Sequence, residues 1–128
     1  TISGRGNMPS YPTKKMPWAD YSESTKKIVI SPGITCIGSN AFENFKNVTE
    51  IEIPEGIYYI GSKAFKGTSI KHVVIPASVK NIGNRAFSDN TKLVDVRFAG
   101  LVDTDGLLTA SIEENYPELE IGAFVFEN

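Results

Sequence analysis

Residues 51–65 read IEIPEGIYYIGSKAF, and close copies of this stretch precede and follow it in the chain. Its last six residues, IGSKAF at 60–65, return as IGSNAF at 37–42 and as IGNRAF at 82–87, so that the repeat period is 23 and then 22 residues. Periods of about 20–50 residues are typical of solenoids, in which each unit buries its apolar face against the next. The sequence therefore predicts a β-rich solenoid of stacked units of 22–23 residues.

Each unit is expected to contain a short strand, because residues 49–53 align with 26–30, 71–75 and 94–98. Side chains alternate between the two faces of a strand. Two apolar residues of each strand should therefore point into the core, namely Ile28 and Ile30, Ile51 and Ile53, Val73 and Ile75, and Val96 and Phe98. A further apolar residue lies three positions before the first inward residue of three of these strands and gives the spacing of leucine-rich repeats. These residues are Val48, Ile70 and Leu93.

The second half of each unit carries a glycine followed by an Ala-Phe pair. Gly38, Gly61 and Gly83 recur at the same place, which indicates either a positive φ angle or a close approach of two chain segments. The phenylalanines of the Ala-Phe pairs should stack along the solenoid as a column, and they are Phe42, Phe65 and Phe87.

The chain is expected to be a single leucine-rich-repeat domain with caps at both ends. Residues 28–98 hold the repeats, residues 1–27 form an N-terminal cap, and residues 99–128 form a degenerate repeat that serves as the C-terminal cap. The predicted covering residues of the first cap are Met8, Tyr11, Met16, Trp18 and Tyr21. Residues 107–116 have helical spacing, and residues 119–124 resemble the repeated hexamer with two residues lost.

Composition and charge exclude several classes of function. The chain has 128 residues, with 13 basic and 15 acidic side chains, and this balance favours no nucleic-acid partner. It holds no apolar run long enough for a membrane span. Its single cysteine, Cys36, excludes an internal disulfide framework. Because the chain begins at Thr1, we expect it to be a mature or trimmed part of a longer protein.

These motifs resemble the BspA-like leucine-rich repeats, whose unit is a strand ending in Ile-Pro, a Val/Ile-x-x-Ile-Gly segment, two polar residues and Ala-Phe. The resemblance covers about residues 1–98, including the N-terminal ISGxGxM and the later Pro-Trp pair. One difference is that the family often carries cysteine shortly after Ala-Phe, where this chain has Phe45, Thr68 and Asn90. The resemblance implies a bacterial, surface-attached or secreted recognition or adhesion module, and it brings no catalytic residues.

The outward side chains of the strands are the first candidate for a contact site with a protein partner. They are of mixed charge, and they are Lys27, Glu50, Glu52, His72, Asp95 and Arg97, with Val29 and Val74 beside them. Such a face could bind a protein through complementary charges. The simpler alternative is a solvated sheet surface on which neighbouring charges pair. His72 lacks a second histidine or a nucleophile, so that it predicts neither a metal site nor catalysis.

A second candidate site is aromatic and consists of Trp18, Tyr58 and Tyr59, which could stack on a carbohydrate. The usual alternative for these rings is burial in the cap or on the sheet. We expect a non-enzymatic binding or adhesion module at the cell surface with no cofactor. A carbohydrate-binding module and a passive spacer within a larger surface protein are the alternatives.

Overall fold

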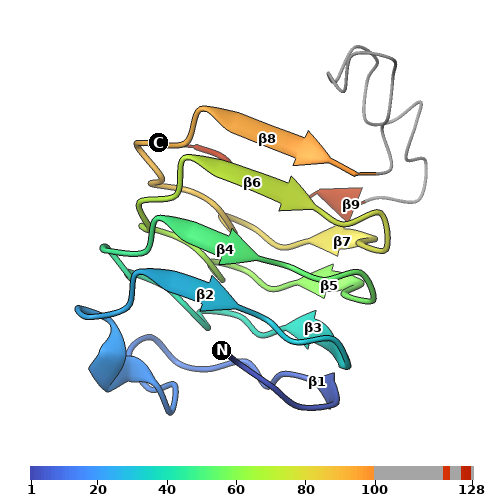
Figure 1. The fold of residues 1–128 in the computed structure, drawn as a ribbon, viewed down its shortest axis with the longest axis horizontal. Helices are drawn as coiled ribbons and strands as arrows, with labels where there is room; N and C mark the ends of the chain where they lie inside the picture. The colour runs from blue at the N-terminus through green and yellow to red at the C-terminus, as the bar shows by residue number, and fades with distance from the viewer. Residues whose placement is uncertain (100–119, 122–124, 128) are drawn as a thin grey trace.

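The computed structural model describes residues 1–99, 120–121 and 125–127, which form a β-solenoid of stacked coils (Figure 1). This confirms the fold class that the repeats predict. The strands of one face are β2 (Lys27–Val29), β4 (Glu50–Glu52), β6 (His72–Ile75) and β8 (Asp95–Phe98). Those of the other face are β1 (Gly6–Asn7), β3 (Ile34–Ile37), β5 (Tyr59–Ile60), β7 (Asn81–Ile82) and β9 (Glu120–Ile121). A short 3-10 helix, η1, spans Ala19–Tyr21.

All strand pairs are parallel, as expected when successive coils stack on one another. The second face is a five-stranded sheet in the order β1-β3-β5-β7-β9, and the first face consists of the pairs β2-β4 and β6-β8. The predicted alignment of the strands is confirmed residue by residue within each pair, since Lys27 lies opposite Glu50 and His72 lies opposite Asp95. Strands β4 and β6 end just before Pro54 and Pro76, which have no amide hydrogen to extend a ladder.

The core lies between the two faces and is built from the residues that alternate inward. Val48, Ile70, Ile57 and Ile82 are fully buried. Two of the predicted inward pairs, Ile28 with Ile30 and Val73 with Ile75, are also buried. Ile51, Ile53, Leu93 and Val96 pack against this core but are only partly buried.

The phenylalanine column is confirmed and is longer than predicted. Phe42, Phe65 and Phe87 stack with ring centroids 5.4 Å apart, and Trp18 and Phe126 extend the column at 5.5 Å on either side. All four ring pairs are stacked, with interplanar angles between 11° and 21°. The column therefore joins every coil from the N-terminal segment to the last described residues.

The position of Phe126 corrects the predicted alignment of the last repeat. Ile121 pairs with Ile82, and the amide of Phe87 donates to the carbonyl of Val125 just as the amide of Phe65 donates to that of Ala86. Ile121 and Phe126 therefore correspond to Ile82 and Phe87, at the same separation in sequence, and Val125 takes the place of alanine, so that the predicted loss of two residues is wrong. The helix expected at 107–116 lies outside the described residues.

The recurring glycine is required by a close approach of neighbouring coils, one of the two predicted reasons. A Cβ atom on Gly61 would lie 2.4 Å from the backbone nitrogen of Ser39, and one on Gly83 would lie 2.5 Å from that of Ser62. Neither glycine has a positive φ angle, and neither does Gly38. The positive φ angle falls two residues later, on Asn40, Lys63 and Arg85.

Replacing Lys63 with asparagine is expected to stabilise the protein. Lys63 has φ 58°, a left-handed conformation that costs an ordinary L-residue about 1–2 kcal/mol and that asparagine adopts more readily. We expect a gain of about 0.5–1 kcal/mol in the free energy of unfolding, measured by urea denaturation. The exposed Lys80, which has no positive φ angle, provides the control Lys80→Asn. An equal effect of both substitutions would contradict the conformational explanation.

The N-terminal segment lies against the first repeat and continues its hydrogen bonding. The amides of Gly6, Met8 and Tyr11 donate to the carbonyls of Gly33, Cys36 and Ser39 at 2.9–3.1 Å. Of the five predicted covering residues, Met16 is buried, and Met8, Tyr11 and Trp18 pack partly buried against the core. Tyr21, the last residue of η1, is 64% exposed, so that its prediction as a covering residue is wrong. The division of the chain into two caps and a repeat region remains a prediction.

Candidate functional site

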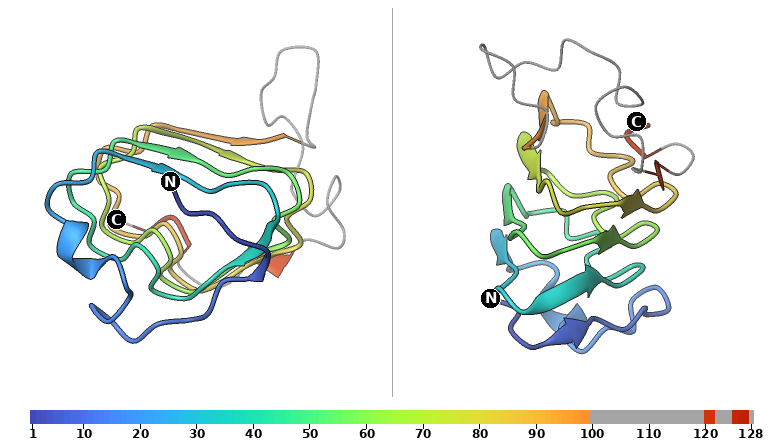
Figure 2. Two further views of the ribbon diagram at one scale, coloured as in Figure 1. Left: turned by 60° about the horizontal axis from the view of Figure 1, so that its bottom comes forward. Right: turned by 90° about the vertical axis from the view of Figure 1, so that its right-hand side faces the viewer.

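The strands β2, β4, β6 and β8 lie side by side along one side of the solenoid (Figures 1 and 2). Because their apolar residues alternate inward, the intervening side chains point to solvent. We call these eight side chains the strand face, and they are Lys27, Val29, Glu50, Glu52, His72, Val74, Asp95 and Arg97. Within the two hydrogen-bonded pairs they stand in register, so that the fold places neighbouring side chains at the spacing of the strands.

The half of the strand face on β2 and β4 is organised around Lys27. Its Nζ lies 2.5 Å from Oε1 of Glu52 and 3.6 Å from Oε2 of Glu50. The hydrogen bond to Glu52 and the charges of both glutamates raise the pKa of Lys27. One lysine thus faces two carboxylates, and this half of the strand face carries an excess of negative charge.

The half on β6 and β8 is organised around Asp95. Its Oδ2 accepts a hydrogen bond from Nε of Arg97 at 3.1 Å and lies 3.6 Å from Nδ1 of His72. Asp95 is the least exposed of the three side chains at 38%, whereas His72 is 66% exposed. Asp95 therefore holds the orientation of two solvent-facing groups, each of which keeps donors free for a partner.

The charges of the strand face add little to stability. Exposed ion pairs typically contribute about 0–1 kcal/mol, because water screens them and the side chains lose freedom when they pair. Val74 of the strand face is 52% exposed, and Val94, which immediately precedes β8, is 78% exposed. The arrangement combines mixed charge with exposed apolar groups, a composition suited to contact with another protein.

The structure places the three aromatic residues of the second candidate site in different surroundings. Trp18 stacks on Phe42, and its Nε1 donates to the carbonyl of Ala41 at 2.7 Å. Tyr58 is 46% exposed, and its hydroxyl donates to Oδ1 of Asn7 at 3.1 Å. A hydrogen bond with Cys36 raises the pKa of Tyr58. Tyr59 lies in β5, partly buried. Trp18 therefore serves the aromatic column, and its ring is already stacked on one side.

The described residues offer no cluster of three or more His, Cys, Asp or Glu side chains that could hold a metal ion. Within the same residues no helix is both long and apolar enough to cross a bilayer. Within the described part of the chain, His72 lies beside Asp95, whose other partner is Arg97, and none of these three side chains is a nucleophile of the serine, cysteine or threonine kind.

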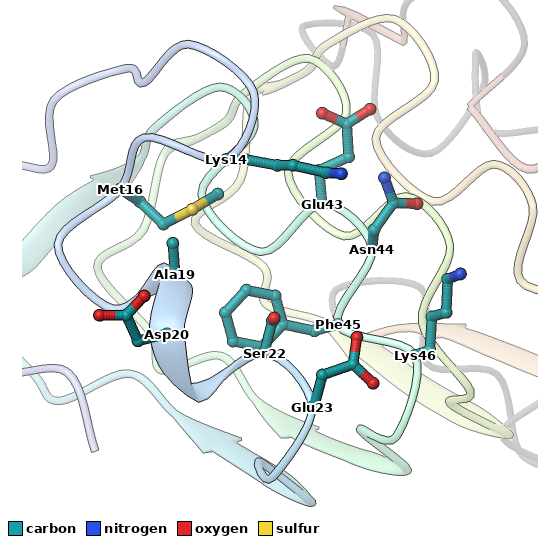
Figure 3. A pocket seen from close by; sticks show the side chains of 10 residues that line it. All are labelled: Lys14, Met16, Ala19, Asp20, Ser22, Glu23, Glu43, Asn44, Phe45 and Lys46. Carbon is teal, nitrogen blue, oxygen red and sulfur yellow. The ribbon is translucent and has the colours of Figure 1, made fainter.

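Sequence reasoning missed a pocket between the N-terminal segment and the first coil (Figure 3). It is lined by Lys14, Met16, Ala19, Asp20, Ser22, Glu23, Glu43, Asn44, Phe45 and Lys46. One signal was present in the sequence, since Phe45 stands where the next two units have the polar residues Thr68 and Asn90. A large ring at that position indicates that the first coil meets a different neighbour.

Comparisons with known proteins find one matching family and two similar solved structures. A model of the BspA type leucine rich repeat region matches residues 19–106 in six copies. A leucine rich cell surface protein from Faecalibacterium prausnitzii A2-165 has 28% sequence identity and a TM-score of 0.58, over 59% of this chain and 20% of that protein. A leucine-rich repeat protein from Eubacterium ventriosum ATCC 27560 has 19% identity and a TM-score of 0.48, over 76% and 38%.

A search of curated proteins gives no match. The chain spans less than two fifths of the length of either solved structure. The repeated hexamers, the stacked coils and a family model that covers most of the chain agree with one another. The chain belongs to the BspA type leucine-rich repeat family.

Proposed function

We propose that this domain is a non-enzymatic recognition or adhesion module of a cell surface, and that it binds a protein partner through the strand face. The observation that carries the proposal is the strand face itself, whose charged and apolar side chains are exposed and held in register by the solenoid. The similar protein from Faecalibacterium prausnitzii is described as a cell surface protein, which supports the location.

The mechanism rests on preorganisation. Binding is weakened by every side chain or loop that must be ordered when the partner arrives. The strand face limits this cost, because the backbone beneath it is fixed by parallel pairing and by the core. Lys27 and Asp95 further restrain their neighbours through ion pairs. The charges then select the partner and orient it, more than they add affinity.

Removing the charges of the strand face is expected to abolish capture of the partner. The variant carries Glu50→Ala, His72→Ala, Asp95→Ala and Arg97→Ala, and it is compared with the wild type in a pull-down from host-surface and extracellular-matrix extracts. Retained proteins are identified by mass spectrometry. We expect one protein to be retained by the wild type and lost, by at least about tenfold, with the variant.

A control variant with Arg5→Ala and Lys80→Ala removes exposed charges next to β1 and β7, on the other face. It should retain the partner as well as the wild type does, and all three proteins should unfold at the same temperature. Equal retention by the strand-face variant would show that the site lies elsewhere. Retention of nothing by the wild type would favour the spacer function.

A further inference from the structure

The pocket between the N-terminal segment and the first coil, here called the N-terminal pocket, has a volume of about 400 Å³. Six of its lining residues come from 14–23, which include η1, and four come from 43–46, which follow Phe42 of the aromatic column. Small-molecule sites typically have volumes of about 300–1,000 Å³. The N-terminal pocket is therefore large enough for a small ligand. It shares no residue with the strand face.

The floor of the N-terminal pocket is apolar. Met16 and Phe45 line it and are only 4% and 2% exposed. Phe45 is held edge-on against Phe42, with ring centroids 5.6 Å apart and an interplanar angle of 84°. The ring lies near the centre of the pocket in Figure 3. A ligand in this pocket would meet a fixed apolar surface beneath it.

The rim of the N-terminal pocket is charged, and four of its charged side chains are unpaired within the described residues. Lys14, Lys46, Asp20 and Glu23 all line the cavity, yet the side chains of these four form no ion pair or hydrogen bond within residues 1–99, 120–121 and 125–127. In Figure 3 the lysines lie at the top and right of the pocket, and the two acids lie at the left and bottom. Opposite charges thus face one cavity without neutralising each other.

Glu43, the fifth charged residue of the rim, differs from these four. Its carboxylate accepts a hydrogen bond from Oγ1 of Thr13 at 2.9 Å and lies 4.0 Å from Nζ of Lys66. Its side chain is only 6% exposed. Glu43 is therefore occupied in joining the N-terminal segment to the coils. The charges available to a ligand are two positive and two negative.

We propose that the N-terminal pocket binds a small zwitterionic peptide, with the dipeptide as the smallest ligand. A free amino terminus would pair with Asp20 or Glu23, a free carboxylate would pair with Lys14 or Lys46, and an apolar side chain would lie over Phe45. A purely anionic ligand would be repelled by the two acids, and a purely cationic one by the two lysines. The termini of an extended dipeptide lie about 7 Å apart, which lets them reach opposite sides of such a cavity.

The test uses the dipeptide Ala-Phe and three matched forms, namely N-acetylated, C-terminally amidated and blocked at both ends. Binding to the whole chain is followed through backbone amide resonances in NMR. We expect the free dipeptide to shift the amides of Ser22, Glu23, Asn44 and Lys46, with a dissociation constant of about 1 mM. Blocking either terminus should weaken binding at least about fivefold, because it removes one of the two charge contacts.

The matched variants are Lys46→Glu, which reverses a rim charge, and Lys80→Glu, which reverses an exposed charge far along the chain next to β7. The first should weaken binding at least about tenfold and the second should leave it unchanged, with equal thermal unfolding of both. The proposal is overturned if the amide resonances do not shift at a dipeptide concentration about ten times the expected dissociation constant. It is also overturned if blocked and free dipeptides bind with equal affinity, or if the two variants bind the free dipeptide with equal affinity. Any of these results leaves the function proposed for the strand face untouched.

Discussion

Replacing Phe65 with alanine is expected to lower the free energy of unfolding by about 3–5 kcal/mol. Phe65 is fully buried and lies in the middle of the aromatic column, with a stacked ring on each side. Its removal deletes both ring contacts and leaves a cavity that the rigid backbone on either side cannot close. Equilibrium denaturation by urea gives the value, provided that the slope of the transition is unchanged.

Tyr21 provides the matched control, because it is a ring of similar size that is 64% exposed. Tyr21→Ala should change stability by no more than about 0.5 kcal/mol. A cost below about 1 kcal/mol for Phe65→Ala would mean that the column does not hold the coils together. Destabilising a coil in the middle of the solenoid also destabilises the coils on either side, since solenoid stability depends on contacts between adjacent units.

Among substitutions that preserve the size of the side chain, Asn90→Asp is expected to lower the free energy of unfolding the most. Asn90 is fully buried, and its Nδ2 donates to the carbonyls of Phe65, Phe87 and Ser88 at 2.7–3.1 Å, while its Oδ1 accepts a bond from Thr68. The substitution places a carboxylate oxygen where the amide nitrogen of Asn90 donated its hydrogen bonds. Several buried carbonyls then lose their donor, at about 1–3 kcal/mol each, so that we expect a loss of at least about 3 kcal/mol at pH 7.

The loss caused by Asn90→Asp should depend on pH, which distinguishes it from a packing defect. Burial against carbonyl oxygens raises the pKa of the introduced carboxyl group above its unfolded value of about 3.9. The folded state then binds the proton more tightly, so that stability is present below the unfolded pKa and is lost as the pH rises through the folded pKa. The stability difference from the wild type should therefore be larger at pH 7 than at about pH 4. An equal difference at both pH values would contradict this account.

The repeats and the strand face could be predicted because they depend on local periodicity. Alternation along a strand assigns Glu50 and His72 to the outside and Val73 to the inside without any knowledge of the partner strand. The recurrence of the Ala-Phe pair predicts the aromatic column for the same reason. Stacking of like units converts each position of the sequence into a column of the structure.

Features that depend on contacts between unlike segments could not be predicted in this way. The sequence after Leu119 allows either Phe124 or Phe126 to follow Phe87 in the column, and only the hydrogen bond from the amide of Phe87 to the carbonyl of Val125 and the stacking of Phe126 on Phe87 decide for Phe126. The N-terminal pocket requires the path of residues 14–23 across the first coil, for which no repeat serves as a guide. Tyr21 was misplaced because its exposure depends on the same path.

The three unlike residues at one position of successive coils have a consequence for assembly. Phe45, Thr68 and Asn90 follow nearly identical Ile-Gly-x-x-Ala-Phe segments, which could otherwise stack in the wrong order or exchange between two molecules. A coil displaced by two units would place the phenyl ring of Phe45 where the amide of Asn90 bonds three carbonyls, and those carbonyls would lose their donor. This position thus penalises misaligned and domain-swapped stacks, so that one order of coils is selected during folding.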